Sequence, residues 1–239
     1  GTLWVNIGDS YYNYRPGKGQ ALVKQSVSKT KQDLPDKCAR RGNKLEGLKE
    51  KDLIGIPWML AFALRADGWY LRQDIIWHKP NPMPESVRDR CTKSHEYLFL
   101  LSKNKKYYYD NEAIKEPVKQ DWGTRNRDAG KYHNPGTGLQ PHSGLTKSYE
   151  RKNKRDVWTI TNKPYKGAHF AVFPPDLIEP CILAGSERGD IILDPFMGSG
   201  TTGMVAKKHG RNYIGCELHE DYASLQTDRI DSIPPQLVL

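Results

Sequence analysis

Three glycines near the carboxyl-terminal end of the sequence have the spacing of a nucleotide-binding loop. Gly198, Gly200 and Gly203 fit G-x-G-x-x-G within the stretch DPFMGSGTTG, between a predicted strand and a predicted helix. Glycines let the backbone turn sharply and let a ligand approach it closely. Glu217 ends the next predicted strand, about 20 residues beyond the first glycine, where a carboxylate can accept both hydroxyls of a ribose. The pattern favours a nucleoside site, although a tight turn without a ligand has the same spacing.

The residues before the first glycine indicate which ligand the loop holds. Asp194 opens the loop, and a carboxylate suits a cationic ligand better than a pyrophosphate. Phe196 and Met197 add an apolar wall. S-adenosylmethionine (AdoMet) has a ribose, an adenine and a sulfonium, and it fits both features. A Rossmann-type NAD-dependent oxidoreductase remains the alternative that these residues disfavour.

Strands and helices alternate along most of the chain of 239 residues. Apolar runs predict strands at 2–8, 69–80, 95–104, 156–160, 189–196 and 211–218, and helices are predicted at 51–68, 174–185, 200–210 and 219–230. This alternation predicts an α/β fold of Rossmann-like type, with a mostly parallel twisted sheet and helices on both faces. Residues 107–155 lack a sustained period and predict an irregular insertion.

The composition indicates which class of binding partner and which cellular compartment to expect. Lys and Arg number 37 against 28 Asp and Glu, a net charge of +9, which favours a polyanion partner. The sequence offers no metal-ligand spacing, and Cys38, Cys91, Cys181 and Cys216 predict free thiols in a reducing compartment. No apolar stretch is long enough to span a bilayer, and the first residues lack a signal-peptide pattern. We expect no membrane association and a cytoplasmic location in a bacterial, archaeal or phage-infected cell.

Several stretches together resemble one family. The stretch LDPFMGSGTTGMVAKKHGRNYIGCELHEDY closely resembles the AdoMet-binding segment of amino-methylating DNA methyltransferases, the N6-adenine/N4-cytosine family. The stretches KGAHFAVFPPDLIEPCILAG, GTLWVNIGDSYY and DIIWHKPNPMPESVRDRCTKSHEYLFLLSK resemble further parts of that family in one order. The resemblance implies AdoMet as cofactor and a site made of Asp194, Pro195, Phe196, Gly198, Ser199, Gly200, Thr201, Thr202, Glu217, Phe170 and Phe173.

The motif order resembles the permuted group often called β, in which the cofactor loop comes last. This order implies a catalytic half at 1–106, a target-recognition region at 107–155 and an AdoMet-binding half at 156–239. A solvated or disordered insert is the alternative for the middle segment. Expected contacts to double-stranded DNA are Lys79, Asn81, Arg88, Arg90, Arg125, Arg127 and Lys131. Asp9 ends the first predicted strand, where a cap and a ligand contact are both open.

The family's catalytic tetrapeptide, Asp/Asn/Ser-Pro-Pro-Tyr/Phe/Trp, is not found in the sequence. FPPD at 173–176 and IPPQ at 233–236 have the wrong flanking residues, and NKPY at 162–165 lacks one proline. In the family this motif holds the amino group of a flipped base and stacks on its ring. We expect it upstream of Gly1, and therefore no catalytic residue is named.

The expected activity is site-specific methyl transfer from AdoMet to adenine N6 or cytosine N4 of DNA. Three alternatives stay open: the NAD-dependent oxidoreductase, a methyltransferase for RNA or protein, and a non-catalytic fragment or subunit that binds DNA or AdoMet. The resemblance also suggests a restriction–modification role, with a cognate restriction endonuclease and a homodimer as partners.

Overall fold

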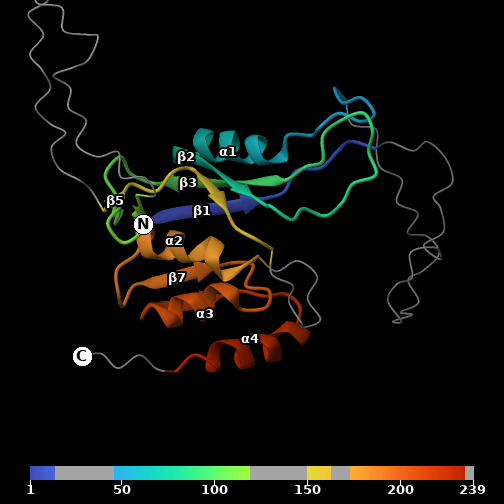
Figure 1. The fold of residues 1–239 in the computed structure, drawn as a ribbon. Coiled ribbons are helices and arrows are strands. Elements are labelled where there is room, and N and C mark those ends of the chain that lie inside the picture. The colour runs from blue at the N-terminus through green and yellow to red at the C-terminus, as the bar shows by residue number, and fades with distance from the viewer. Residues whose placement is uncertain (14–45, 119–149, 163–172, 235–239) are drawn as a thin grey trace, which may run out of the picture.

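The computed structural model of the chain describes residues 1–13, 46–118, 150–162 and 173–234. Figure 1 shows an upper layer built around β1, β2 and β3 and a lower layer of β7, α3 and α4, with α2 between them. In chain order the elements are β1 (Thr2–Ile7), α1 (Ile56–Ala66), β2 (Tyr70–His78), β3 (His95–Ser102), β4 (Glu116–Pro117), β5 (Arg151–Lys152), β6 (Val157–Thr159), α2 (Pro175–Gly185), β7 (Ile191–Asp194), α3 (Thr201–Lys208), β8 (Asn212–Gly215) and α4 (Asp221–Asp231).

The expected α/β class is confirmed, but the sheet is mixed and not mostly parallel. The upper sheet has the order β1-β3-β2-β6, in which β3 is antiparallel to both β1 and β2, whereas β6 is parallel to β2. β7 and β8 form a separate parallel pair. The cause is the connection between β2 and β3: residues 79–94 contain three prolines and no helix, so they cannot act as the helical crossover that a parallel pair requires.

Helices α1 and α2 cover opposite faces of the upper sheet. Alternate residues of β3 point to opposite faces. Phe99 and Leu101 pack with Ala61 of α1, whereas Leu98 packs in a second cluster with Leu177 and Cys181 of α2. Burial raises the pKa of the Cys181 thiol far above its ordinary value, so this cysteine is an inert core residue.

The lower layer is joined to the upper one through α2. Ile182 of α2 packs with Val205 and Ala206 of α3, and Ile192 of β7 packs against the same cluster. At the last residue of α2, a Cβ on Gly185 would lie 2.5 Å from Thr2 Oγ1 on β1. Only glycine permits this close approach, and α2 therefore contacts both layers.

Strands β4 and β5 form a short ribbon within the predicted recognition region. They pair the two segments on either side of residues 119–149. Glu116 pairs with Lys152 and Pro117 with Arg151, and the Val118 amide donates to the Glu150 carbonyl at 3.0 Å. Residues 119–149, which include Arg125, Arg127 and Lys131, lie outside the described residues. The proposed boundaries at 106 and 155 stay predictions.

Candidate cofactor site

The glycine loop begins where β7 and β8 end side by side. Asp194 of β7 is in register with Gly215 of β8. The Cys216 amide donates to the Asp194 carbonyl at 2.9 Å, and the Met197 amide donates to the Cys216 carbonyl at 2.9 Å. Parallel strands bring their carboxyl ends to one edge, which is where open α/β sheets bind ligands. The register therefore places the predicted loop and Glu217 at one site.

The side chain of Asp194 organises the loop. Its Oδ1 accepts the Phe196 amide at 2.9 Å, and its Oδ2 accepts the Thr202 hydroxyl. These two bonds join the end of β7 to the first turn of α3. The carboxylate thus fixes the path of the loop, and its negative charge remains at the site where a cationic ligand was predicted.

Glycine is needed at each position of the motif for a different structural reason. Gly198 and Gly200 have positive φ angles of 52° and 81°. A Cβ on Gly200 would also lie 3.1 Å from the Gln226 backbone. At Gly203, within α3, a Cβ would meet the Ile230 Cδ1 atom of α4 at 2.8 Å. The spacing of the motif therefore combines two backbone turns with one close helix contact.

Glu217, which follows β8, accepts hydrogen bonds that hold the glycine loop. Its Oε2 accepts the Gly198 amide at 2.8 Å, and its Oε1 accepts the His219 amide at 2.9 Å. The predicted acid and the predicted glycine are thus in direct contact.

Two residues of α4 that the sequence analysis did not identify also hold the loop. The Gln226 side-chain amide donates to the Gly198 carbonyl at 2.8 Å, and Arg229 donates to the Ser199 hydroxyl at 2.8 Å. They are three residues apart, so they share one face of the helix. That spacing is visible in the sequence, but nothing in the sequence shows which face meets the loop.

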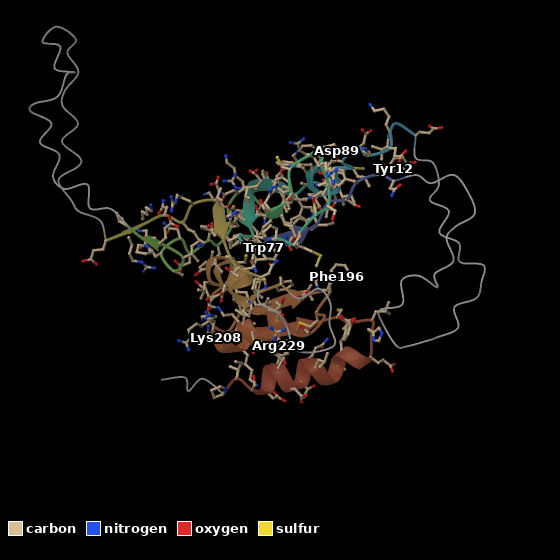
Figure 2. All side chains as sticks on the ribbon, turned by 45° about the vertical axis from the view of Figure 1, so that its right-hand side comes forward. Tyr12, Trp77, Asp89, Phe196, Lys208 and Arg229 are labelled. Carbon is tan, nitrogen blue, oxygen red and sulfur yellow. The ribbon has the colours of Figure 1, made fainter. Side chains whose placement is uncertain are left out.

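The three predicted aromatic residues have different surroundings. Phe196 is 85% exposed at the start of the loop, and Figure 2 shows it to the right of Trp77 and Arg229, at a height between the two. Phe173 is half-buried against the core cluster of Trp77, Leu98 and Leu177. Phe170 lies outside the described residues. The structure thus leaves Phe196 open to a ligand and gives Phe173 a packing role.

Asp9 at the end of β1 acts as a helix cap. Its Oδ1 accepts the amides of Ser10 at 2.9 Å, Gly55 at 3.0 Å and Ile56 at 3.1 Å. The last two amides belong to the amino-terminal end of α1, which attracts a carboxylate. Of the two roles left open for Asp9, the geometry supports the cap.

The predicted DNA-contacting residues on 79–94 take part in local interactions. Lys79 forms an ion pair with Glu96 and lies 4.2 Å from the centre of the Trp77 ring. Asn81 and the backbone of Asn162 exchange two hydrogen bonds, at 3.3 and 3.4 Å. These contacts hold the loop beside β6, and contact of Lys79 or Asn81 with DNA stays a prediction.

A pocket at the carboxyl side of β1 contains the two predicted arginines of this loop. Arg88 and Arg90 line it together with Tyr11, Tyr12 and Lys51. The Arg90 guanidinium lies 4.0 Å from the centre of the Tyr11 ring and pairs with Glu85. Figure 2 shows Tyr12 and Asp89, which both line the pocket, well apart from Phe196. The pocket is therefore distinct from the glycine loop.

The described residues contain neither a metal-binding cluster nor a membrane-spanning helix. Within these ranges no group of three His, Cys, Asp or Glu side chains is placed to hold a metal ion. None of the helices in the described part of the chain combines the length and apolarity needed to cross a membrane.

The fold and the site together define a class, an α/β domain with a glycine loop and an adjacent carboxylate at the carboxyl ends of two parallel strands, the arrangement of nucleoside-binding folds. The comparison with known families agrees with this class and narrows it. The chain belongs to the DNA methylase family of N6 and N4 methyltransferases, which matches residues 1–228.

Curated relatives support the same family. The chain is 49% identical to the type II methyltransferase M.SmaI of Serratia marcescens over 235 residues, which cover 96% of this chain and 67% of that protein. It is 47% identical to M.Cfr9I of Citrobacter freundii, covering 96% of this chain and 65% of that protein. The chain therefore spans about two thirds of the length of these relatives.

Solved structures show the same fold. A DNA modification methylase of Thermus thermophilus, named as such provisionally and solved with S-adenosyl-L-methionine, matches with a TM-score of 0.55 at 21% identity, covering 98% of this chain and 70% of that one. The cytosine-N4-specific PvuII DNA methyltransferase matches with a TM-score of 0.54 at 19% identity, covering 78% and 60%. At these identities the likeness concerns the fold.

Proposed function

We propose that these 239 residues bind AdoMet at the glycine loop and form part of an enzyme that methylates an exocyclic amino group of DNA, adenine N6 or cytosine N4. The observation that supports this most is the pair Asp194 and Glu217, which hold the two ends of one loop at adjacent strand ends. In the proposed complex, Glu217 accepts the ribose hydroxyls, and Phe196 contacts the apolar part of the cofactor. The hydrogen bonds that Asp194 accepts hold its carboxylate near the sulfonium, which carries the methyl group.

The chemistry also requires groups that activate the acceptor nitrogen. The lone pair of an exocyclic amino group is conjugated with the ring, and acceptors for its N–H bonds make the nitrogen more nucleophilic. The sequence contains two Pro-Pro pairs, at 174–175 and at 234–235, and neither has the flanking residues of the expected tetrapeptide. We propose that polypeptide outside these residues supplies the acceptors, and that 107–155 contributes to target recognition.

A labelled-methyl assay with duplex DNA, RNA and protein acceptors tests the proposed function. The gene product that includes the expected tetrapeptide should label duplex DNA alone, and hydrolysis to nucleosides should then identify N6-methyladenine or N4-methylcytosine. Labelling of RNA or protein in place of DNA would refute the proposal. A cognate restriction endonuclease and a homodimer also belong to the proposal, since type II methyltransferases are the relatives of this chain.

Failure of the 239 residues to transfer methyl, with AdoMet binding intact, would favour the alternative of a non-catalytic binding fragment. The absence of the tetrapeptide from this sequence supports this alternative. Labelling by the longer gene product under the same conditions would separate a fragment from a protein that has no activity at all.

A further inference from the structure

The proline loop, residues 79–94, connects β2 to β3 and presents one large apolar side chain to solvent. Met83 in this loop is 85% exposed. Because β1 and β2 are both antiparallel to β3, they run in the same direction, and the loop begins at the edge where β1 also ends. Figure 1 shows β1 and β7 pointing the same way. The proline loop and the glycine loop therefore lie on the same side of the molecule.

The sequence of the proline loop restricts its backbone around Met83. Prolines stand at 80, 82 and 84, and each has its own φ angle fixed at about −65°. A residue that precedes a proline is also restricted, to extended conformations. From 79 to 84 every residue is either a proline or precedes one. This segment therefore has little conformational entropy to lose when Met83 contacts a partner.

Contacts near both ends of the proline loop hold it in place. At its base, the Lys79 amide donates a hydrogen bond to the Ser94 carbonyl at 2.7 Å. Further along, the Arg90 guanidinium lies 4.0 Å from the centre of the Tyr11 ring, beside the end of β1. Met83 is therefore carried by a segment that is fixed both by its prolines and by its contacts with the upper sheet.

The proline loop also has an excess of positive charge. It carries four basic and two acidic residues: Lys79, Arg88, Arg90, Lys93, Glu85 and Asp89. Both carboxylates already pair with cations. Within the described ranges no carboxylate pairs with Arg88 or Lys93. A partner that fits this surface has anionic groups outside and an apolar interior, and duplex DNA has both, in its phosphates and its stacked bases.

We propose that Met83 is a wedge that enters the base stack of duplex DNA beside the target base, while Arg88 and Lys93 contact the flanking phosphates. Methionine is one of the apolar side chains that proteins insert between base steps to unstack them. The wedge lowers the cost of extruding the target base toward the glycine loop. Met83 contacts neighbouring bases and not the amino group that is methylated, and the inference rests on the proposed function, whose substrate is DNA.

The test uses the gene product that includes the expected tetrapeptide, with two duplexes that carry its target sequence. The target base is correctly paired in one duplex and faces a mismatched base in the other, where extrusion costs less. Met83→Ala should lower kcat/KM for methyl transfer by about tenfold on the paired duplex and by no more than about threefold on the mismatched duplex. Each value is compared with that of the unchanged protein on the same duplex.

Two further variants serve as controls. Met83→Leu keeps an apolar side chain of similar volume and should retain most of the activity on both duplexes. Met59→Ala makes the same substitution as Met83→Ala at a methionine of α1 that is 62% exposed, and it should behave as the unchanged protein does. The AdoMet affinity, measured by calorimetric titration, should be the same in all of these variants.

Each outcome decides for or against the wedge. An equal loss for Met83→Ala on both duplexes would overturn the inference, because it would indicate that Met83 packs against another part of the enzyme. Full activity of Met83→Ala on the paired duplex, or an equal loss in Met59→Ala, would also overturn it. Failure of the unchanged protein to label any duplex would refute the proposed function, whereas normal labelling by both the unchanged protein and Met83→Ala would refute the wedge alone.

Discussion

At the scale of single residues, the loop depends on two carboxylates with different partners. Asp194 holds the loop to α3, and Glu217 holds it to the segment after β8. Both residues were predicted from the sequence, because their types and spacing follow from the chemistry of the ligand. Gln226 and Arg229 were not predicted, since their role depends on how α4 packs and not on any local pattern.

Removal of the Asp194 carboxylate should disorganise the cofactor loop. Asp194→Ala leaves the Phe196 amide and the Thr202 hydroxyl without their acceptor, at a net cost of about 1–3 kcal/mol. We expect AdoMet affinity to fall at least tenfold in isothermal titration calorimetry. The control is Asp190→Ala at the opposite end of β7, where the carboxylate accepts the Glu187 amide. An equal loss in both variants would contradict a specific role for Asp194.

Substitution at Glu217 should affect recognition of the ribose. Glu217→Gln keeps the shape of the side chain but replaces one acceptor oxygen by a donor. We expect weaker AdoMet binding, and a smaller penalty for a cofactor analogue that lacks the ribose hydroxyls than the unchanged protein shows. A full penalty for the analogue in the variant would show that another residue recognises the ribose. Competition binding with the two compounds measures this.

At the scale of elements, the sequence predicted the order of the long strands and helices but not how the sheet is divided. The apolar runs identified β1, β2, β3, β7 and β8, and glycine and proline signals marked the ends of helices such as α1 and α2. The antiparallel placement of β3 depends on the irregular connection 79–94, which contains no helix that could act as the crossover of a parallel pair. The short pair β4–β5 has too few residues for a periodic signal.

The cap at α1 should contribute measurably to stability. Asp9→Ala removes the acceptor of the Gly55 and Ile56 amides and should lower the free energy of unfolding by about 1 kcal/mol in urea denaturation. Asp9→Asn, which keeps one oxygen, should lose less. The control is Asp67→Ala at the other end of α1, where the exposed pair with Lys103 contributes little. A larger loss at Asp67 would contradict the cap.

The contact of Glu179 on α2 with the end of α3 should make the free energy of unfolding depend on pH. Burial alone raises the pKa of Glu179, but hydrogen bonds from Lys208 and His209 outweigh it and hold that pKa below its ordinary value of 4.5. Because the pKa is lowered in the folded state, the stabilisation is present above pH 4.5 and is lost as the pH falls through the folded-state pKa.

Glu179→Gln tests this dependence. The variant should be less stable than the unchanged protein by roughly 0.5–1 kcal/mol near pH 6, and the difference should shrink as the pH is lowered below 4.5. Thermal denaturation at a series of pH values measures it. The exposed Glu187→Gln is the control for the Glu-to-Gln substitution itself. A gap between Glu179→Gln and the unchanged protein that stays constant down to about pH 3 would refute the assignment.

At the scale of the whole molecule, α2 is the element that joins the two sheets. It packs on the upper sheet through Leu177 and on α3 through Ile182, so the carboxyl ends of β1 and β7 face the same side. The sequence predicted the strands and helices around the glycine loop because the signals for them are local. It could not predict that β1 and β7 lie in different sheets, because strand pairing is a property of the tertiary arrangement.

The central claim, that the glycine loop holds AdoMet, is tested most directly by calorimetric titration of the 239-residue protein with AdoMet and, separately, with NADH. We predict saturable binding of AdoMet at one site per chain and no binding of NADH. Binding of NADH without binding of AdoMet would contradict the claim, and the loop would then be that of a dinucleotide enzyme.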